Sequence, residues 1–136
     1  FPSPRRWLLG SRALVPLTRE HLWALPRLTE SLDRMGLTVD QVPLTPGAAV
    51  VNGTRVLGVG GLLRMPDGTW KAWGMPQGQL SRAEGIALAR LTKRWLEAQL
   101  DSGEFPALLA DFDLQDLQVA AWARFLGFRK ESPCPG

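Results

Sequence analysis

The sequence predicts an α/β (α+β) domain built on a mixed sheet, in which an antiparallel meander is followed by a parallel β-α-β crossover. Two observations carry this prediction. The dipeptide Asn52-Gly53 between two apolar runs is the strongest short-range signal of a β-hairpin. A helix with a capping box at residues 81–84 precedes the apolar run 105–112. A strand, a long helix and another strand imply a right-handed parallel crossover.

The meander is expected to have three strands, at residues 48–51, 54–65 and 69–75. Asn-Gly supplies the positive φ angles that a type I′ turn requires, and residues 66–68 make the second turn. Gly58, Gly60 and Gly61 lie inside the middle strand. Glycines at such positions indicate a bulge or a close approach of two backbones.

The segment before the meander begins with a short edge strand at residues 13–17, because Pro16 has no N–H to give to a central ladder. Thr18 then caps a helix that Pro26 kinks or divides. A second short helix is expected at residues 29–35, closed by Gly36.

The crossover helix is expected to run from the cap Ser81 to about Leu100. Its apolar face is predicted to carry Leu88, Leu91, Trp95 and Ala98. The run 105–112 has the composition of a buried strand. A second amphipathic helix follows Asp113 and stops at Gly127, and residues 128–131 offer one last strand.

Composition excludes several classes of protein. The chain has 136 residues, of which 45% are hydrophobic, and it is interpreted as one folded domain. A single Cys and a single His exclude an internal disulfide and a histidine metal centre, and no metal site is predicted. Charges or prolines interrupt every apolar run, so no membrane segment is expected. The net charge of +3 is interpreted as ordinary surface charge rather than a nucleic-acid footprint.

The chain divides into residues 1–12 as an N-terminal arm, 13–131 as the folded domain and 132–136 as a C-terminal tail. The arm carries two prolines, the basic pair Arg5-Arg6 and the apolar segment Trp7-Leu8-Leu9. Apolar terminal segments dock either on their own domain or on a partner surface. The sequence leaves both interpretations open.

Two segments and the order of elements carry a family resemblance. The segment Asp116-Leu-Gln-Val-Ala-Ala-Trp-Ala-Arg-Phe-Leu-Gly-Phe128 contains a helix that closes with Leu-Gly-Phe, and Val15-Pro-Leu-Thr-Arg-Glu-His-Leu22 joins a strand to a helix. Both resemble the GNAT N-acetyltransferase superfamily, in which Asn commonly stands in the place of Asp116. The resemblance covers about residues 13–131 and is closest to short GNAT-like proteins encoded by tailed phages. It implies a GNAT-like mixed sheet with helices on both faces.

The resemblance also implies a site for acetyl-CoA, in a gap where the fourth strand splays from the fifth. Here that gap would open between a strand ending near Met75 and one ending near Phe112. The pyrophosphate would lie on the start of the following helix, where unpaired N–H groups and the helix dipole attract phosphates. The cofactor-binding residues that the resemblance implies are Met75, Gln77, Gly78, Gln79, Leu80, Ser81 and Arg82.

The loop departs from the family pattern, Gln/Arg-x-x-Gly-x-Gly/Ala. Aligned by Pro76, the pattern falls on Gln79, Arg82 and Glu84, so both glycine positions carry side chains. Glu84 is expected to repel a pyrophosphate. The dipeptide Gln77-Gly78 offers a shorter cradle and Arg82 a charge-assisted contact. The other interpretation of this segment is a capped helix with no ligand.

The catalytic residues are a second departure. Many family members place a Tyr general acid four residues before the final Gly, but Ala123 occupies that position and the chain has no Tyr. Asp113 and Asp116 are the candidate bases for the incoming ammonium group. Carboxylates that follow strands also cap helices, which is the alternative for both. His21 is interpreted as a structural imidazole.

Two functions therefore stay open. The first is an acyltransferase that moves an acetyl group from acetyl-CoA to an unknown amine, on a small molecule or a protein, mainly by positioning the two reactants. The second is a catalytically inactive GNAT-fold interaction or structural protein, whose arm and sheet gap bind a protein partner in a phage particle or a host complex. A cytoplasmic location, or the virion for a phage protein, is expected in either case.

Overall fold

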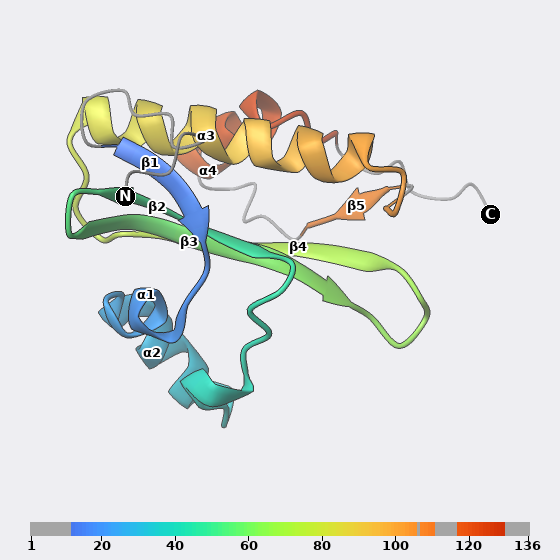
Figure 1. Ribbon diagram of the computed structural model, residues 1–136, viewed down its shortest axis with the longest axis horizontal. Coiled ribbons are helices and arrows are strands. Elements are labelled where there is room, and N and C mark those ends of the chain that lie inside the picture. The colour runs from blue at the N-terminus through green and yellow to red at the C-terminus, as the bar shows by residue number, and fades with distance from the viewer. Residues whose placement is uncertain (1–11, 106, 111–116, 130–136) are drawn as a thin grey trace, which may run out of the picture.

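The computed structural model describes residues 12–105, 107–110 and 117–129 (Figure 1). Its elements are, in order, β1 (Arg12–Pro16), α1 (Arg19–Trp23), α2 (Pro26–Arg34), the 3-10 helix η1 (Val39–Gln41), β2 (Gly47–Asn52), β3 (Arg55–Arg64), β4 (Trp70–Pro76), α3 (Arg82–Asp101), β5 (Leu108–Leu109) and α4 (Leu117–Phe125). The predicted arm, except for Arg12, and the predicted tail lie outside the described residues. The division into arm, domain and tail therefore stays a prediction.

A five-stranded mixed sheet forms the centre of the fold, in the order β1-β2-β3-β4-β5. Strands β1 to β4 pair as antiparallel neighbours, whereas β4 and β5 are parallel. Helix α3 joins the two parallel strands and lies on the opposite side of the sheet from α1 and α2 (Figure 1). The predicted α/β (α+β) class, with its meander, its crossover and helices on both faces, is confirmed.

The turn between β2 and β3 differs in type from the predicted one. Asn52 is the last paired residue of β2 and lies opposite Arg55, so that Gly53 and Thr54 form the two-residue loop. Gly53 has a φ of 61°, and no described residue other than glycine has a positive φ. A type I′ turn requires positive φ at both loop residues, while a type II′ turn requires it at the first alone. The hairpin is confirmed, and the predicted type I′ turn is wrong because the loop begins one residue later.

Strand β3 contains the bulge that its glycines indicated. Val50 of β2 lies opposite Gly58 and Val51 lies opposite Val56, which leaves Leu57 as the extra residue. A Cβ placed on Gly58 would lie 2.8 Å from the side chain of Leu88 in α3. Leu57 and Leu88 belong to one buried cluster, so the bulge turns both Leu57 and Gly58 toward α3.

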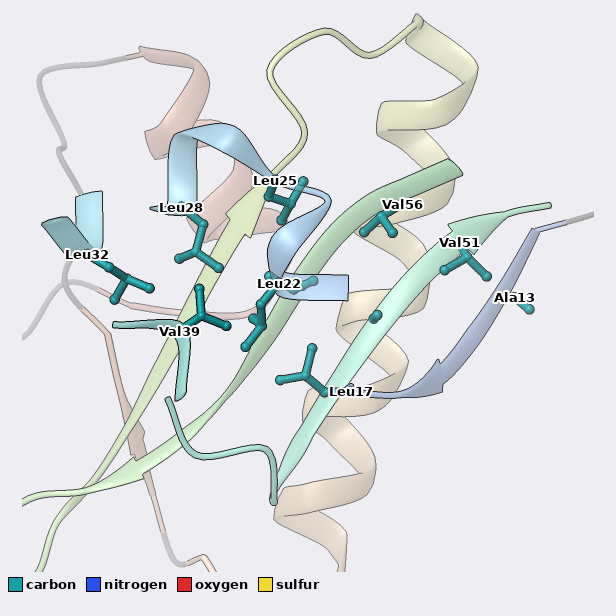
Figure 2. Close-up of a cluster of buried hydrophobic side chains, with 11 residues drawn as sticks. Ala13, Leu17, Leu22, Leu25, Leu28, Leu32, Val39, Val51 and Val56 are labelled. Atoms are coloured by element: carbon teal, nitrogen blue, oxygen red, sulfur yellow. The ribbon is translucent and has the colours of Figure 1, made fainter. Parts of the chain in front are cut away.

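Helices α1 and α2 and the 3-10 helix cover one face of the sheet with a group of buried aliphatic side chains. Figure 2 shows Leu22, Leu25 and Leu28 between this helical layer and the strands. Leu22 is 0% exposed and Leu25 1%. The full cluster is Ala13, Leu17, Leu22, Leu25, Leu28, Leu32, Val39, Ala49, Val51, Val56 and Val59. Burial of one such leucine contributes about 1.5–3 kcal/mol to folding, so this cluster holds the helical layer against the sheet.

Helices α3 and α4 cover the opposite face. Val50, Leu57 and Leu88 are buried there, and Trp122 of α4 packs against them. The capping box predicted for α3 is present, and the helix extends to Asp101. Ala98, predicted on the apolar face, is exposed, and Leu96 is buried instead, because the buried line follows the eight-residue spacing from Leu88 to Leu96.

Two predicted boundaries were wrong. Pro26 divides the segment, one of the two outcomes predicted for it, and begins α2 because the first turn of a helix does not need the missing N–H. Helix α2 therefore starts three residues before the predicted 29–35. The described part of the predicted strand 105–112 forms ladder pairs only at Leu108 and Leu109, and Leu109 is 43% exposed. This strand lies at the end of the described sheet, where one neighbour cannot bury it.

Candidate functional site

Strand β4 pairs with β5 over a short stretch. Trp70 lies opposite Leu108 and Lys71 opposite Leu109, and the pairing ends there in the described part of the chain. Strand β4 itself continues to Pro76 and stays paired with β3 on its other side. We call residues 72–76, on the side that faces away from β3, the β5-side edge. The predicted gap would open along this edge, but its other side, near Phe112, lies outside the described residues, so the gap stays a prediction.

The backbone groups that β4 turns toward this edge follow from its register with β3. The N–H of Gln77 donates to the carbonyl of Leu57 at 2.8 Å, which marks one hydrogen-bonded pair. Hydrogen-bonded and non-hydrogen-bonded pairs alternate along an antiparallel ladder. Ala72 and Gly74 are therefore in non-hydrogen-bonded positions relative to β3, and they direct their N–H and C=O groups toward the β5-side edge.

Glycines keep side chains away from the sheet face next to this edge. Trp73 and Met75 pack on the α1 and α2 side, so Gly74, which lies between them, faces α3. Gly60 faces the same way, because it lies directly opposite Gly74 in the antiparallel ladder, and a Cβ on Gly60 would lie 2.8 Å from the carbonyl oxygen of Trp73. No residue with a Cβ fits at Gly60 without a backbone shift. The α3-facing surface here is therefore peptide backbone.

Loop 77–81 connects the β5-side edge to α3, and Gln77 fixes its start. The side-chain amide of Gln77 donates to the carbonyl of Val56 at 3.2 Å and to that of Ala24 at 3.4 Å. Its amide oxygen accepts the N–H of Gly78 at 3.2 Å. Gln77, predicted to bind a cofactor, thus uses its side chain to join the end of β4 to β3 and to the α1–α2 connection.

The first turn of α3 is held by three side chains. The hydroxyl of Ser81 accepts the N–H of Glu84 at 3.1 Å, and the Glu84 carboxylate accepts the N–H of Ser81 at 2.9 Å. The second carboxylate oxygen of Glu84 accepts from Nε of Arg55 at 3.0 Å. Arg55 also donates to the carbonyl oxygen of Gln79. Arg55, at the start of β3, therefore ties loop 77–81 to the helix.

The hydrogen bond from the Ser81 backbone, assisted by Arg55, holds the pKa of the Glu84 carboxyl below its ordinary 4.5. Glu84 is therefore ionised at neutral pH, as the sequence suggested. Its charge, however, is matched by the Arg55 guanidinium, a contact across 29 residues that the sequence did not predict. The repulsion expected between Glu84 and a bound anion is correspondingly reduced.

Gly85 is a candidate site residue that the alignment by Pro76 leaves out. The same family pattern occurs without gaps at Arg82-x-x-Gly85-x-Ala87, three residues later. Gly85 is the fourth residue of α3, and its N–H donates to the Ser81 carbonyl at 2.9 Å. A Cβ at Gly85 would have no atom within 4 Å. Neither packing nor backbone conformation in the described structure requires glycine here, although glycine weakens a helix by about 0.8–1.0 kcal/mol relative to alanine.

The remaining predicted cofactor residues are divided between the two faces. Met75 packs against the buried cluster between the sheet and helices α1 and α2. Leu80 packs against the buried cluster between the sheet and helix α3. Gly78, Gln79 and Arg82 are exposed beside the loop. Residues 77–82 therefore lie together at the start of α3, whereas Met75 points to the other side of the sheet.

The candidate bases Asp113 and Asp116 lie outside the described residues, and their roles stay predictions. Ala123 is 5% exposed, so the position of the family tyrosine is filled by a buried methyl group. His21 accepts the N–H of Thr18 at 3.0 Å through Nδ1 and completes the capping box of α1. That contact is the structural role expected of this imidazole.

No protein-family model and no curated protein matches the sequence. Among solved structures, an acetyltransferase of the GNAT family from Bacillus anthracis superimposes with a TM-score of 0.62 at 9% sequence identity, over 90% of this chain and 82% of that one. The chain has the GNAT fold. This confirms the fold that the resemblance implied, and at such low identity the similarity concerns the fold alone.

Two negative findings concern the described residues of this GNAT-fold chain. Within them, no helix is long and apolar enough to cross a membrane. The same residues contain no group of three or more His, Cys, Asp or Glu side chains placed to hold a metal ion.

Proposed function

We propose that this chain is an acyltransferase that transfers an acetyl group from acetyl-CoA to an amine, with the pyrophosphate of the cofactor on the first turn of α3 and the thioester along the β5-side edge. The observation that carries the proposal is the geometry of β4, whose pairing with β5 stops at Lys71 in the described part of the chain. Its register with β3 directs the Ala72 and Gly74 backbone groups toward the β5-side edge, on the strand that leads into α3. The GNAT fold supports it.

The residues at the helix start fit a phosphate-bearing cofactor. The N–H groups of Arg82 and Ala83, at the first two positions of α3, have no acceptor within the helix. Arg27, Arg55 and Arg82 border the loop and the helix start, and Glu84 is the opposing carboxylate. Three guanidinium groups against one carboxylate leave two net positive charges. Gly85 adds an open surface against which a pyrophosphate can lie.

The proposed acetyl transfer depends little on individual side chains. Acetyl-CoA supplies an acetyl group activated as a thioester. The N–H groups of Ala72 and Gly74 are donors for a carbonyl oxygen at the β5-side edge, where they would stabilise developing negative charge. Ala123 offers no proton for a leaving thiolate. Catalysis would therefore rest mainly on holding the amine and the thioester together.

Calorimetric titration with CoA and with acetyl-CoA tests cofactor binding directly, and release of free thiol from acetyl-CoA in the presence of a panel of primary amines tests transfer. At a ligand concentration of 100 times the dissociation constant, binding should stabilise the fold by about 2.7 kcal/mol. The absence of both binding heat and thermal stabilisation at millimolar CoA would contradict the proposal and favour the inactive, partner-binding alternative.

A further inference from the structure

Arg27 of α2 lies beside loop 77–81, although it belongs to the helix pair on the other face of the sheet. Its Cδ lies 3.3 Å from the position that a Cβ on Gly78 would occupy. The carbonyl of Ala24, three residues earlier, accepts from the side chain of Gln77 at 3.4 Å. The connection between α1 and α2 and the first turn of α2 are therefore placed against the loop that precedes α3.

The guanidinium group of Arg27 is available for a ligand. Arg27 is exposed, and its side chain forms no hydrogen bond or ion pair with any residue in the described ranges. Arg34, on the same helix, instead donates to Ser31 at 3.2 Å. A guanidinium presents paired N–H donors that match two oxygens of a phosphate. Arg27 is thus a phosphate-binding group held next to a site where phosphates are expected.

We propose that Arg27 binds a phosphate group of CoA and thereby fixes α2 against the cofactor loop. The inference rests on the proposed function, because it assumes that CoA binds at the start of α3. It adds a binding residue from α2, outside the loop and helix that the sequence indicated. It also links the two faces of the sheet, because Arg27 belongs to α2, and α2 packs on the other face through Leu28 and Leu32.

Calorimetric titration with CoA on the full chain tests this proposal in wild type, Arg27→Ala, Arg27→Lys and the matched control Arg34→Ala. Loss of a charge-assisted phosphate contact should weaken CoA binding about tenfold or more in R27A. The CoA affinity of R27K should lie between those of R27A and wild type, and the CoA affinity of R34A should stay within about twofold of wild type. Because Arg27 is exposed, the melting temperatures without ligand should agree among all four proteins.

Hydrogen exchange gives a second readout that a purely structural role would not change. CoA should slow amide exchange in residues 27–34 of wild type and leave those amides unchanged in R27A. Wild-type affinity in R27A, or an equal loss in R34A, would overturn the role of Arg27 while leaving the proposed function intact. Failure of wild type itself to bind CoA would overturn both proposals together.

Discussion

Replacement of Gly85 by alanine should move stability and cofactor affinity in opposite directions. The residue has helical backbone geometry, and a Cβ there meets no atom within 4 Å, so alanine adds no steric strain. The gain in helix propensity should raise the free energy of unfolding by about 0.5–1 kcal/mol. For a chain of 136 residues this corresponds to a rise in melting temperature of about 2–4 °C.

The same methyl group would stand where the pyrophosphate is proposed to lie. Forcing one extra carbon into a packed contact typically costs about 1–3 kcal/mol, which corresponds to a five- to 150-fold weaker affinity for CoA. Urea unfolding and calorimetric titration measure the two effects on one preparation. A stabilised Gly85→Ala protein that binds CoA as tightly as wild type would refute the placement of the pyrophosphate.

Gly36 provides the matched control. It ends α2 with a φ of 74°, and a Cβ there also meets nothing within 4 Å. Gly36→Ala should therefore destabilise the fold through backbone strain of about 1–2 kcal/mol, with no change in the affinity of the folded protein for CoA. An equal loss of affinity in both glycine variants would show that the effect at Gly85 is not local.

Three further perturbations probe other parts of the structure. Glu84→Gln keeps the hydrogen bond to the Ser81 N–H and removes one negative charge, so the affinity for CoA should rise about two- to fivefold by calorimetric titration. Unchanged or weaker binding would count against phosphate at this helix start. The lowered pKa of Glu84 stabilises the fold at pH values above about 4.5, and this contribution should disappear as pH falls through the folded-state pKa. The urea midpoint should accordingly fall between pH 6 and pH 3 by less in Glu84→Gln than in wild type, and equal falls would argue against the contact. Leu22→Ala empties a fully buried position and should lower the free energy of unfolding by about 2–5 kcal/mol, and a loss below 1 kcal/mol would mean that the helical layer is not packed as described.

Local signals accounted for most of the fold. The hairpin at Asn52-Gly53, the capping box at Ser81 and the glycine-marked bulge each depend on residues a few positions apart, and each is present. The errors arose where tertiary neighbours decide. The type I′ turn was wrong because the register of β2 with β3 places the loop one residue later. The fifth strand was predicted too long because apolar composition does not reveal that β5 has β4 alone as a neighbour in the described sheet.

The candidate site was less accessible from sequence because its decisive contacts join distant segments. Arg55 meets Glu84 across 29 residues, and Gln77 meets Ala24 across 53. No spacing rule connects such pairs. Gly85 was the exception, since the family spacing from Arg82 to Ala87 could be read directly from the sequence. The alignment by Pro76 instead placed the pattern three residues earlier, on Gln79, Arg82 and Glu84.

Under the proposed function, the bare peptide surface formed by Gly60 and Gly74 would have a consequence for selectivity among acyl groups. A surface without side chains offers the same hydrogen-bonding groups to an acetyl group as to a longer acyl chain, so it cannot measure chain length. Discrimination between short and long donors would then depend on side chains around this backbone surface, including those of the helices that border the sheet. A lineage carrying this fold could change its preferred donor through substitutions in those helices while its strands stay constant.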